Sequence, residues 1–99
     1  PHFVRTTELS DGELAAEAQF RLGESRAARG ERHGAADAFV KLSILYGASP
    51  WARRGLLQAG LTYRELGQAD KAQRFWQELI NTHPDSPEAR AAKSHLEER

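Results

Sequence analysis

Apolar residues recur at intervals of three and four positions along nearly the whole chain. This spacing places them on one side of an α-helix, and abundant Ala with few β-branched residues favours the same structure. Glycine and proline interrupt the pattern at residues 30–34, at 47–50, around Gly67 and at 83–87. The pattern therefore predicts an all-α protein with five helices and no β-strand.

Serine marks three of the expected helix starts. Ser10 and Glu13 have the spacing of a capping box, in which each side chain accepts a backbone N–H that the helix leaves unpaired. Ser49-Pro50 and Ser86-Pro87 each combine a capping Ser with a Pro at the first helical position, where the missing N–H costs nothing. We expect helices to begin at these three places.

The sequence repeats itself after 37 residues. The aligned pairs are Gly23/Gly60, Gly30/Gly67, Ala35/Ala72, Phe39/Trp76, Leu42/Leu79 and Ser49-Pro50/Ser86-Pro87. Periods of this length indicate stacked units that cannot bury their apolar faces alone. The small residues allow two helix backbones to approach closely, so each unit is expected to be a helical hairpin.

Residues 59–84 have the pattern A-G-x-x-Y-x-x-x-G-x-x-x-x-A-x-x-x-W-x-x-L-x-x-x-x-P, which closely resembles a tetratricopeptide repeat. The preceding unit matches less fully, because Arg26 replaces the Tyr and Gly47 replaces the Pro. The resemblance implies a right-handed superhelix of two hairpins and a C-terminal capping helix. We expect a linker or irregular segment over residues 1–9 and a domain over 10–99. The domain would contain repeat one (10–47), repeat two (49–84) and the capping helix (86–98).

The long repeat and the phrase P-D-S-P-E-A are similar to repeats of bacterial envelope proteins, such as the Tol-Pal accessory protein and outer-membrane-assembly lipoproteins. This resemblance favours the periplasm or cell envelope, with the cytoplasm as the alternative. The chain begins at Pro1 and contains no Met, so we expect it to be a piece of a longer protein. It contains no long apolar run, and we expect no direct insertion into a membrane.

The composition argues against several kinds of chemistry. Fourteen basic and fourteen acidic residues cancel, so no net field attracts nucleic acid. There is no Cys, and the four His lack the spacing of metal ligands. No Ser lies in a nucleophile elbow, and the G-E-R-H-G segment lacks the features of a phosphate loop. We therefore expect no catalysis, no cofactor and no bound metal.

The resemblance implies that the first helix of each hairpin lines a concave surface that binds a peptide or protein segment. Carried over by position, this surface contains Glu17, Phe20, Arg21, Glu24, Arg54, Leu57, Gln58, Leu61 and Arg64, with Ser94 and His95 closing it. Its apolar members, Phe20, Leu57 and Leu61, form an apolar floor for a peptide with an acidic end, or they complete the core. Trp51, next to the helix start, is interpreted as a packing residue at the joint between the hairpins.

Val40 and Ile44 form a second candidate surface, because the residues that align with them are the polar Gln77 and Asn81. Residues 3–4, a neighbouring repeat of a parent chain, or a second subunit in a homo-oligomer would cover them. The sequence thus predicts a non-catalytic protein-protein interaction module. The alternatives are a structural or self-assembly segment of a larger protein and an accessory to an enzyme.

Overall fold

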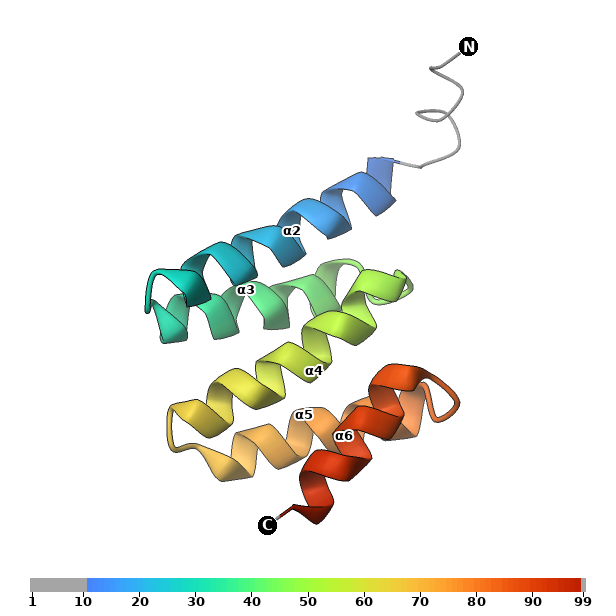
Figure 1. Ribbon diagram of the computed structural model, residues 1–99. Helices are drawn as coiled ribbons and strands as arrows, with labels where there is room; N and C mark the ends of the chain where they lie inside the picture. Colours follow the sequence, from blue (N-terminus) through green and yellow to red (C-terminus); the bar gives the residue numbers. More distant parts are fainter. Residues whose placement is uncertain (1–10, 99) are drawn as a thin grey trace.

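The computed structural model describes residues 11–98, which form five α-helices and no β-strand. The helices are α2 (Asp11–Ala28), α3 (Arg32–Leu45), α4 (Pro50–Glu65), α5 (Ala69–Thr82) and α6 (Pro87–Glu97). Figure 1 shows them stacked in chain order, with α2 and α3 forming one hairpin, α4 and α5 a second, and α6 at the end. The predicted all-α fold is confirmed, and the helix breaks lie where they were predicted, except that the break expected at 30–34 is shorter because α3 begins at Arg32.

The ends of the helices follow from local chemistry. Ser49 caps α4 by accepting the backbone N–H of Trp51 at 3.1 Å, and Ser86 caps α6 by accepting that of Ala89 at 3.0 Å. Gly30 and Gly67 follow α2 and α4 with φ values of 81° and 80°, a left-handed conformation that side chains with a Cβ rarely adopt. Ser10 lies outside the described residues, so its capping box remains a prediction.

Replacing Ser86 with Ala should lower the free energy of unfolding by about 1 kcal/mol, because the first turn of α6 loses its side-chain acceptor. Urea denaturation followed by circular dichroism measures this difference. Ser94→Ala in the same helix is the matched control, because Ser94 is exposed in the helix interior. An equal loss for both variants would show that the cap does not stabilise α6.

Two clusters of buried residues form a core that runs through the stack. The first contains Ala16, Phe20, Ala35, Phe39, Leu42 and Ala59, and the second contains Leu56, Ala72, Trp76, Leu79, Ala89 and Ala92. Phe75 packs against both clusters, so the two hairpins share one continuous apolar interior. The aligned pairs have a direct structural meaning, because the Phe39 ring fills the space beside Gly23 and the Trp76 ring the space beside Gly60.

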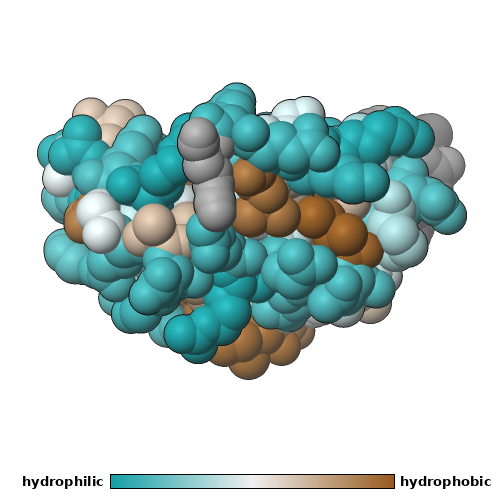
Figure 2. Space-filling model, turned by 90° about the horizontal axis from the view of Figure 1, so that it is seen from below, coloured by the Kyte–Doolittle hydropathy of each residue, from teal (hydrophilic) through white to brown (hydrophobic). Residues whose placement is uncertain are grey.

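Helix α6 covers the second cluster on one side only. Ala89 and Ala92 are buried, whereas Lys93 and Glu97 are exposed at the positions where α4 has the buried Leu56 and Gly60. Figure 2 views the protein from the end formed by α5 and α6, and a strip of hydrophobic residues lies there between hydrophilic rows. This end of the stack is therefore partly polar and partly apolar.

In the described part of the stack, the first helices of neighbouring hairpins contact each other but the second helices do not. The first helices contact one another, α2 with α4 and α4 with α6, whereas the backbones of α3 and α5, which are both described in full, do not come into contact. We call the surface formed by α2, α4 and α6 the inner face, and the surface formed by α3 and α5 the outer face. The unequal contacts curve the stack toward its inner face.

Candidate functional site

Two hollows lie between successive first helices, and the 37-residue repeat relates them. The first has a volume of about 560 Å³ and the second about 450 Å³. The first is lined by Glu24, Ala27, Ala28, Arg32, Phe39, Gln58, Leu61, Thr62 and Glu65. The second is lined by Arg64, Ala69, Ala72, Gln73, Trp76, His95, Leu96 and Glu98. Because Phe39 aligns with Trp76 and Gln58 with His95, the hollow belongs to the repeat itself.

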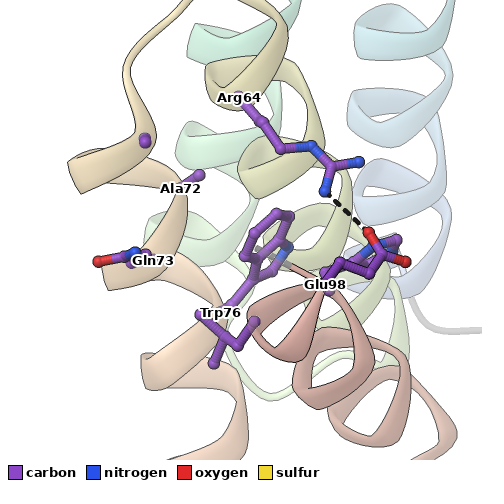
Figure 3. Close-up of a pocket in the computed structure, with 8 residues that line it drawn as sticks. Arg64, Ala72, Gln73, Trp76 and Glu98 are labelled. Carbon is purple, nitrogen blue, oxygen red and sulfur yellow. Dashed lines mark hydrogen bonds and ion pairs between the residues drawn. The ribbon is translucent and has the colours of Figure 1, made fainter.

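The second hollow is built around Trp76, which is 2% exposed. Figure 3 shows its ring pointing from α5 toward Arg64 and Glu98, which are joined by an ion pair of 3.2 Å. The Arg64 guanidinium lies 5.4 Å from the ring centroid, and the His95 ring stacks on the indole at 5.1 Å. The indole N–H donates to the Leu57 carbonyl at 3.3 Å. These contacts tie the ends of α4 and α6 together over an aromatic floor.

The side chains of Arg64, His95 and Glu98 interact with one another at the mouth of this hollow. The approach of His95, and then of Arg64, lowers the pKa of the Glu98 carboxyl. The His95 Nδ1 is buried and has no hydrogen-bond partner in the described part of the chain. It lies 3.5 Å from the Glu98 carboxylate, so the two groups form an ion pair when the imidazole ring is protonated. Glu98 therefore remains an anion at the mouth of the hollow.

The predicted charged residues of α2 interact mainly with one another. Arg21 pairs with Glu24 at 2.8 Å and with Glu17 at 3.5 Å, one helical turn to either side. All three side chains are largely accessible at the surface of α2. Two carboxylates thus balance the charge of Arg21, which weakens its attraction for an acidic ligand.

Phe20 is not part of an open floor, because it is 6% exposed and belongs to the first core cluster. Its ring lies 5.5 Å from that of Phe39 and 5.3 Å from that of Trp51. Of the two interpretations of Phe20, a binding floor or a core residue, the second is correct. Leu57 and Leu61 are half-buried against the second cluster, and Leu61 also lines the first hollow.

Trp51 contributes to the inner face in a way that the sequence analysis missed. It packs against the first core cluster, as expected for a residue at the joint, but it remains half-buried. Arg21 and Arg54 both lie against it, with guanidinium carbons 5.2 Å and 4.6 Å from its centroid. Arg54 is one helical turn from Trp51, so that contact could have been inferred, whereas the contact with Arg21 is tertiary.

Arg54 is the least constrained of the predicted arginines. Its side chain is 54% exposed, and its ion pair with Glu88 is long, at 3.9 Å. Glu88 also pairs more closely with Arg53, at 3.3 Å. Arg54 can therefore turn toward a ligand without leaving Glu88 unpaired.

The remaining predicted residues lie on different surfaces. Gln58, Arg64 and His95 line the two hollows, and Ser94 is exposed on α6. Val40 and Ile44 lie on the outer face, where they line a separate hollow. Residues 3–4, one of the three covers considered for this pair, lie outside the described residues.

Residues 11–98 contain neither a membrane-spanning helix nor a cluster of metal ligands. No helix there is long and apolar enough to cross a membrane. No group of three or more His, Asp or Glu side chains in the same range is placed to hold a metal ion.

Comparison with known protein families agrees with the repeat that the sequence displays. A model of the tetratricopeptide repeat matches residues 17–49 and 54–86, which together make up about two thirds of the chain. The two matches begin 37 residues apart, the same spacing that aligns the sequence with itself. A search of curated proteins found no match.

Proposed function

Because the chain belongs to the tetratricopeptide repeat family, whose members generally serve as protein-protein interaction modules, we propose that its inner face binds a segment of a partner protein. The observation that carries this proposal is the pair of repeat-related hollows between the first helices. Their floors are the aromatic rings of Phe39 and Trp76. A segment crossing α2, α4 and α6 would place one side chain in each hollow.

The chemistry of the inner face favours a ligand with apolar side chains and a carboxylate. Leu57 and Leu61 lie one turn apart on α4 and are only half-buried, so an apolar side chain can cover them. Arg54 provides a cation with a weak internal partner, whereas Arg21 and Arg64 have close ones. The acidic end of the segment would therefore lie near Arg54 and Trp51.

Replacing Leu57 with Asp, or Arg54 with Glu, should weaken capture of partner proteins from a cell extract by at least about tenfold, because each change removes a central contact. The measurement is quantitative mass spectrometry of proteins retained by the immobilised domain, after circular dichroism shows that each variant is folded. Gln77→Asp, a change of an exposed residue of α5 on the outer face, is the matched control. Retention that is unchanged in both inner-face variants would refute binding at this face.

A structural or self-assembly role is the second candidate, and the free side of α2 favours it. Leu14 and Leu22 are 41% and 37% exposed, and they align with Trp51 and Ala59. In α4 those two positions pack against the preceding hairpin. The equivalent surface of α2 is therefore suited to a further hairpin or a second subunit. In both candidate roles the domain has no catalytic site of its own, and we propose the cell envelope as its location.

A further inference from the structure

The outer face contains an apolar furrow that the repeat fold does not require. Because α3 and α5 diverge, two adjoining hollows of about 610 Å³ and 130 Å³ open beside them and share Tyr63. We call them together the outer furrow. It is lined by Asp37, Val40, Lys41, Ile44, Leu45, Tyr63, Lys71, Arg74 and Phe75.

The floor and one wall of the outer furrow are apolar. The rings of Tyr63 and Phe75 stack with centroids 5.5 Å apart and planes 8° from parallel. Beside them, Ile44 is 74% exposed and Leu45 is 58% exposed, the two highest values among the large apolar side chains described. Burial of Tyr63, and then the charge of Asp37, raises the pKa of its phenol, which therefore stays a neutral hydrogen-bond donor.

Packing of the domain does not explain Ile44, which is 74% exposed, whereas Val40 is half-buried against the first core cluster. Val40 and Ile44 align with Gln77 and Asn81 of the second repeat. Those two residues hydrogen-bond to each other on the surface at 3.2 Å, and the second hairpin folds with them in place. The same backbone positions thus accept polar residues, so the exposed Ile44 of the first repeat is suited to a contact outside the domain.

The charges around the outer furrow differ from those of the inner face. Lys41, Lys71 and Arg74 line it, and none of them forms an ion pair with a carboxylate within residues 11–98. Lys71 instead lies 5.2 Å from the centroid of Tyr63. Asp37 is the one acidic residue among the described lining. On the inner face, in contrast, four arginines are each paired with a glutamate: Arg21, Arg53, Arg54 and Arg64.

From this combination we propose that the outer furrow docks an acidic amphipathic helix of a partner protein. The apolar stripe of that helix would cover Ile44 and the Tyr63–Phe75 stack, and its carboxylates would pair with Lys41, Lys71 and Arg74. A third helix suits a wedge between two helices. An extended strand does not, because helices offer no free backbone edge to pair with it.

A designed peptide tests the chemistry of the outer furrow. The probe is a fluorescently labelled amphipathic helix of about four turns, with Leu residues one turn apart and Glu on the flanking positions. The comparison peptide has Lys in place of every Glu. We expect the Glu peptide to bind at least about tenfold more tightly than the Lys peptide by fluorescence anisotropy, with a difference that shrinks as salt is added.

Variants of the domain localise the binding. Two variants, Ile44→Ser and the double change Lys41→Glu with Arg74→Glu, should each lower the affinity for the Glu peptide by at least about tenfold. All three side chains are exposed, so the domain should remain folded. The matched control Leu22→Ser, an exposed apolar residue on α2, should leave binding unchanged. The inner-face change Leu57→Asp should leave it unchanged as well, which separates this test from that of the inner face.

Three results would overturn the proposal. The first is equal binding, or no binding, of the two peptides. The second is loss of the Glu peptide with Leu57→Asp but not with Ile44→Ser, which would place the binding on the inner face. The third is a dimer in sedimentation experiments that Ile44→Ser dissociates, which would make a second copy of the chain the occupant of the outer furrow.

Discussion

Replacing Leu42 with Ala should lower the free energy of unfolding by about 2–5 kcal/mol, because a fully buried side chain is removed and a cavity remains. Leu42 lies at the joint between the two hairpins. A Cβ placed on Gly55 would come within 2.8 Å of the Leu42 Cδ2, which shows how closely this side chain packs on α4. The loss would be a large part of the total stability of a domain of this size.

Urea denaturation of the Leu42→Ala and Ile44→Ala variants provides the measurement and its control. The two residues are two positions apart on α3, but Leu42 is 0% exposed and Ile44 is 74% exposed. We expect Ile44→Ala to change stability by less than about 0.5 kcal/mol. Similar losses for the two variants would mean that the Ile44 side chain is covered in the isolated domain, contrary to the structure.

Replacing Gly60 with Ala should destabilise the protein by about 1–3 kcal/mol, although Ala normally favours a helix over Gly by about 1 kcal/mol. The added Cβ would clash with the Trp76 Nε1 and would come within 2.5 Å of its Cε2. Trp76 resists displacement, because its ring stacks on His95 and its N–H is bonded to the Leu57 carbonyl. We expect the overpacking to exceed the gain in helix propensity.

Gly34→Ala is the matched control, with the opposite expected sign. Gly34 also lies within a helix, but an added Cβ there would meet only the flexible Arg26 side chain, at 3.2 Å. We expect this variant to be as stable as the original or more stable by up to about 1 kcal/mol. Thermal unfolding of both variants compares the signs. A Gly60→Ala variant as stable as Gly34→Ala would show that close contact between Gly60 and Trp76 is not needed.

Both faces of the domain can be occupied together under our proposals. The inner face pairs its arginines internally and offers two hollows with aromatic floors. The outer furrow leaves its cations without carboxylate partners within the described residues and exposes Ile44. The first arrangement favours apolar contacts with a single carboxylate near Arg54, whereas the second favours a ligand with several negative charges.

The sequence predicted the local structure well because the signals for it lie within a few residues. A capping Ser followed by Pro fixed the starts of α4 and α6, and Gly30 and Gly67 adopt the left-handed conformation expected after a first helix. The 37-residue repeat also identified the pairs of small and large residues that meet between helices, such as Gly60 and Trp76. A repeat makes such contacts visible because it shows the same requirement twice.

The candidate site was harder to predict because its contacts join residues that are far apart in the chain. Phe20 and Leu57 occupy aligned positions, yet Phe20 is buried and Leu57 is half-buried. The difference follows from the neighbouring Trp51, whose ring covers Phe20 from the next helix. One sequence does not say which aromatic residue of a neighbouring helix will reach such a position.

By itself, the sequence determined the helices, their ends, the hairpin repeat and the family, because propensity, capping and periodicity act over short distances. Only the tertiary structure decided which apolar residues remain accessible and which charges remain unpaired. The stacking of the helices sets the contact of Trp51 with Arg21, the ion pair of Glu98 with Arg64, and the outer furrow beside α3 and α5. The helix contacts between α2, α4 and α6, without a contact between α3 and α5, set that geometry and with it both proposed surfaces.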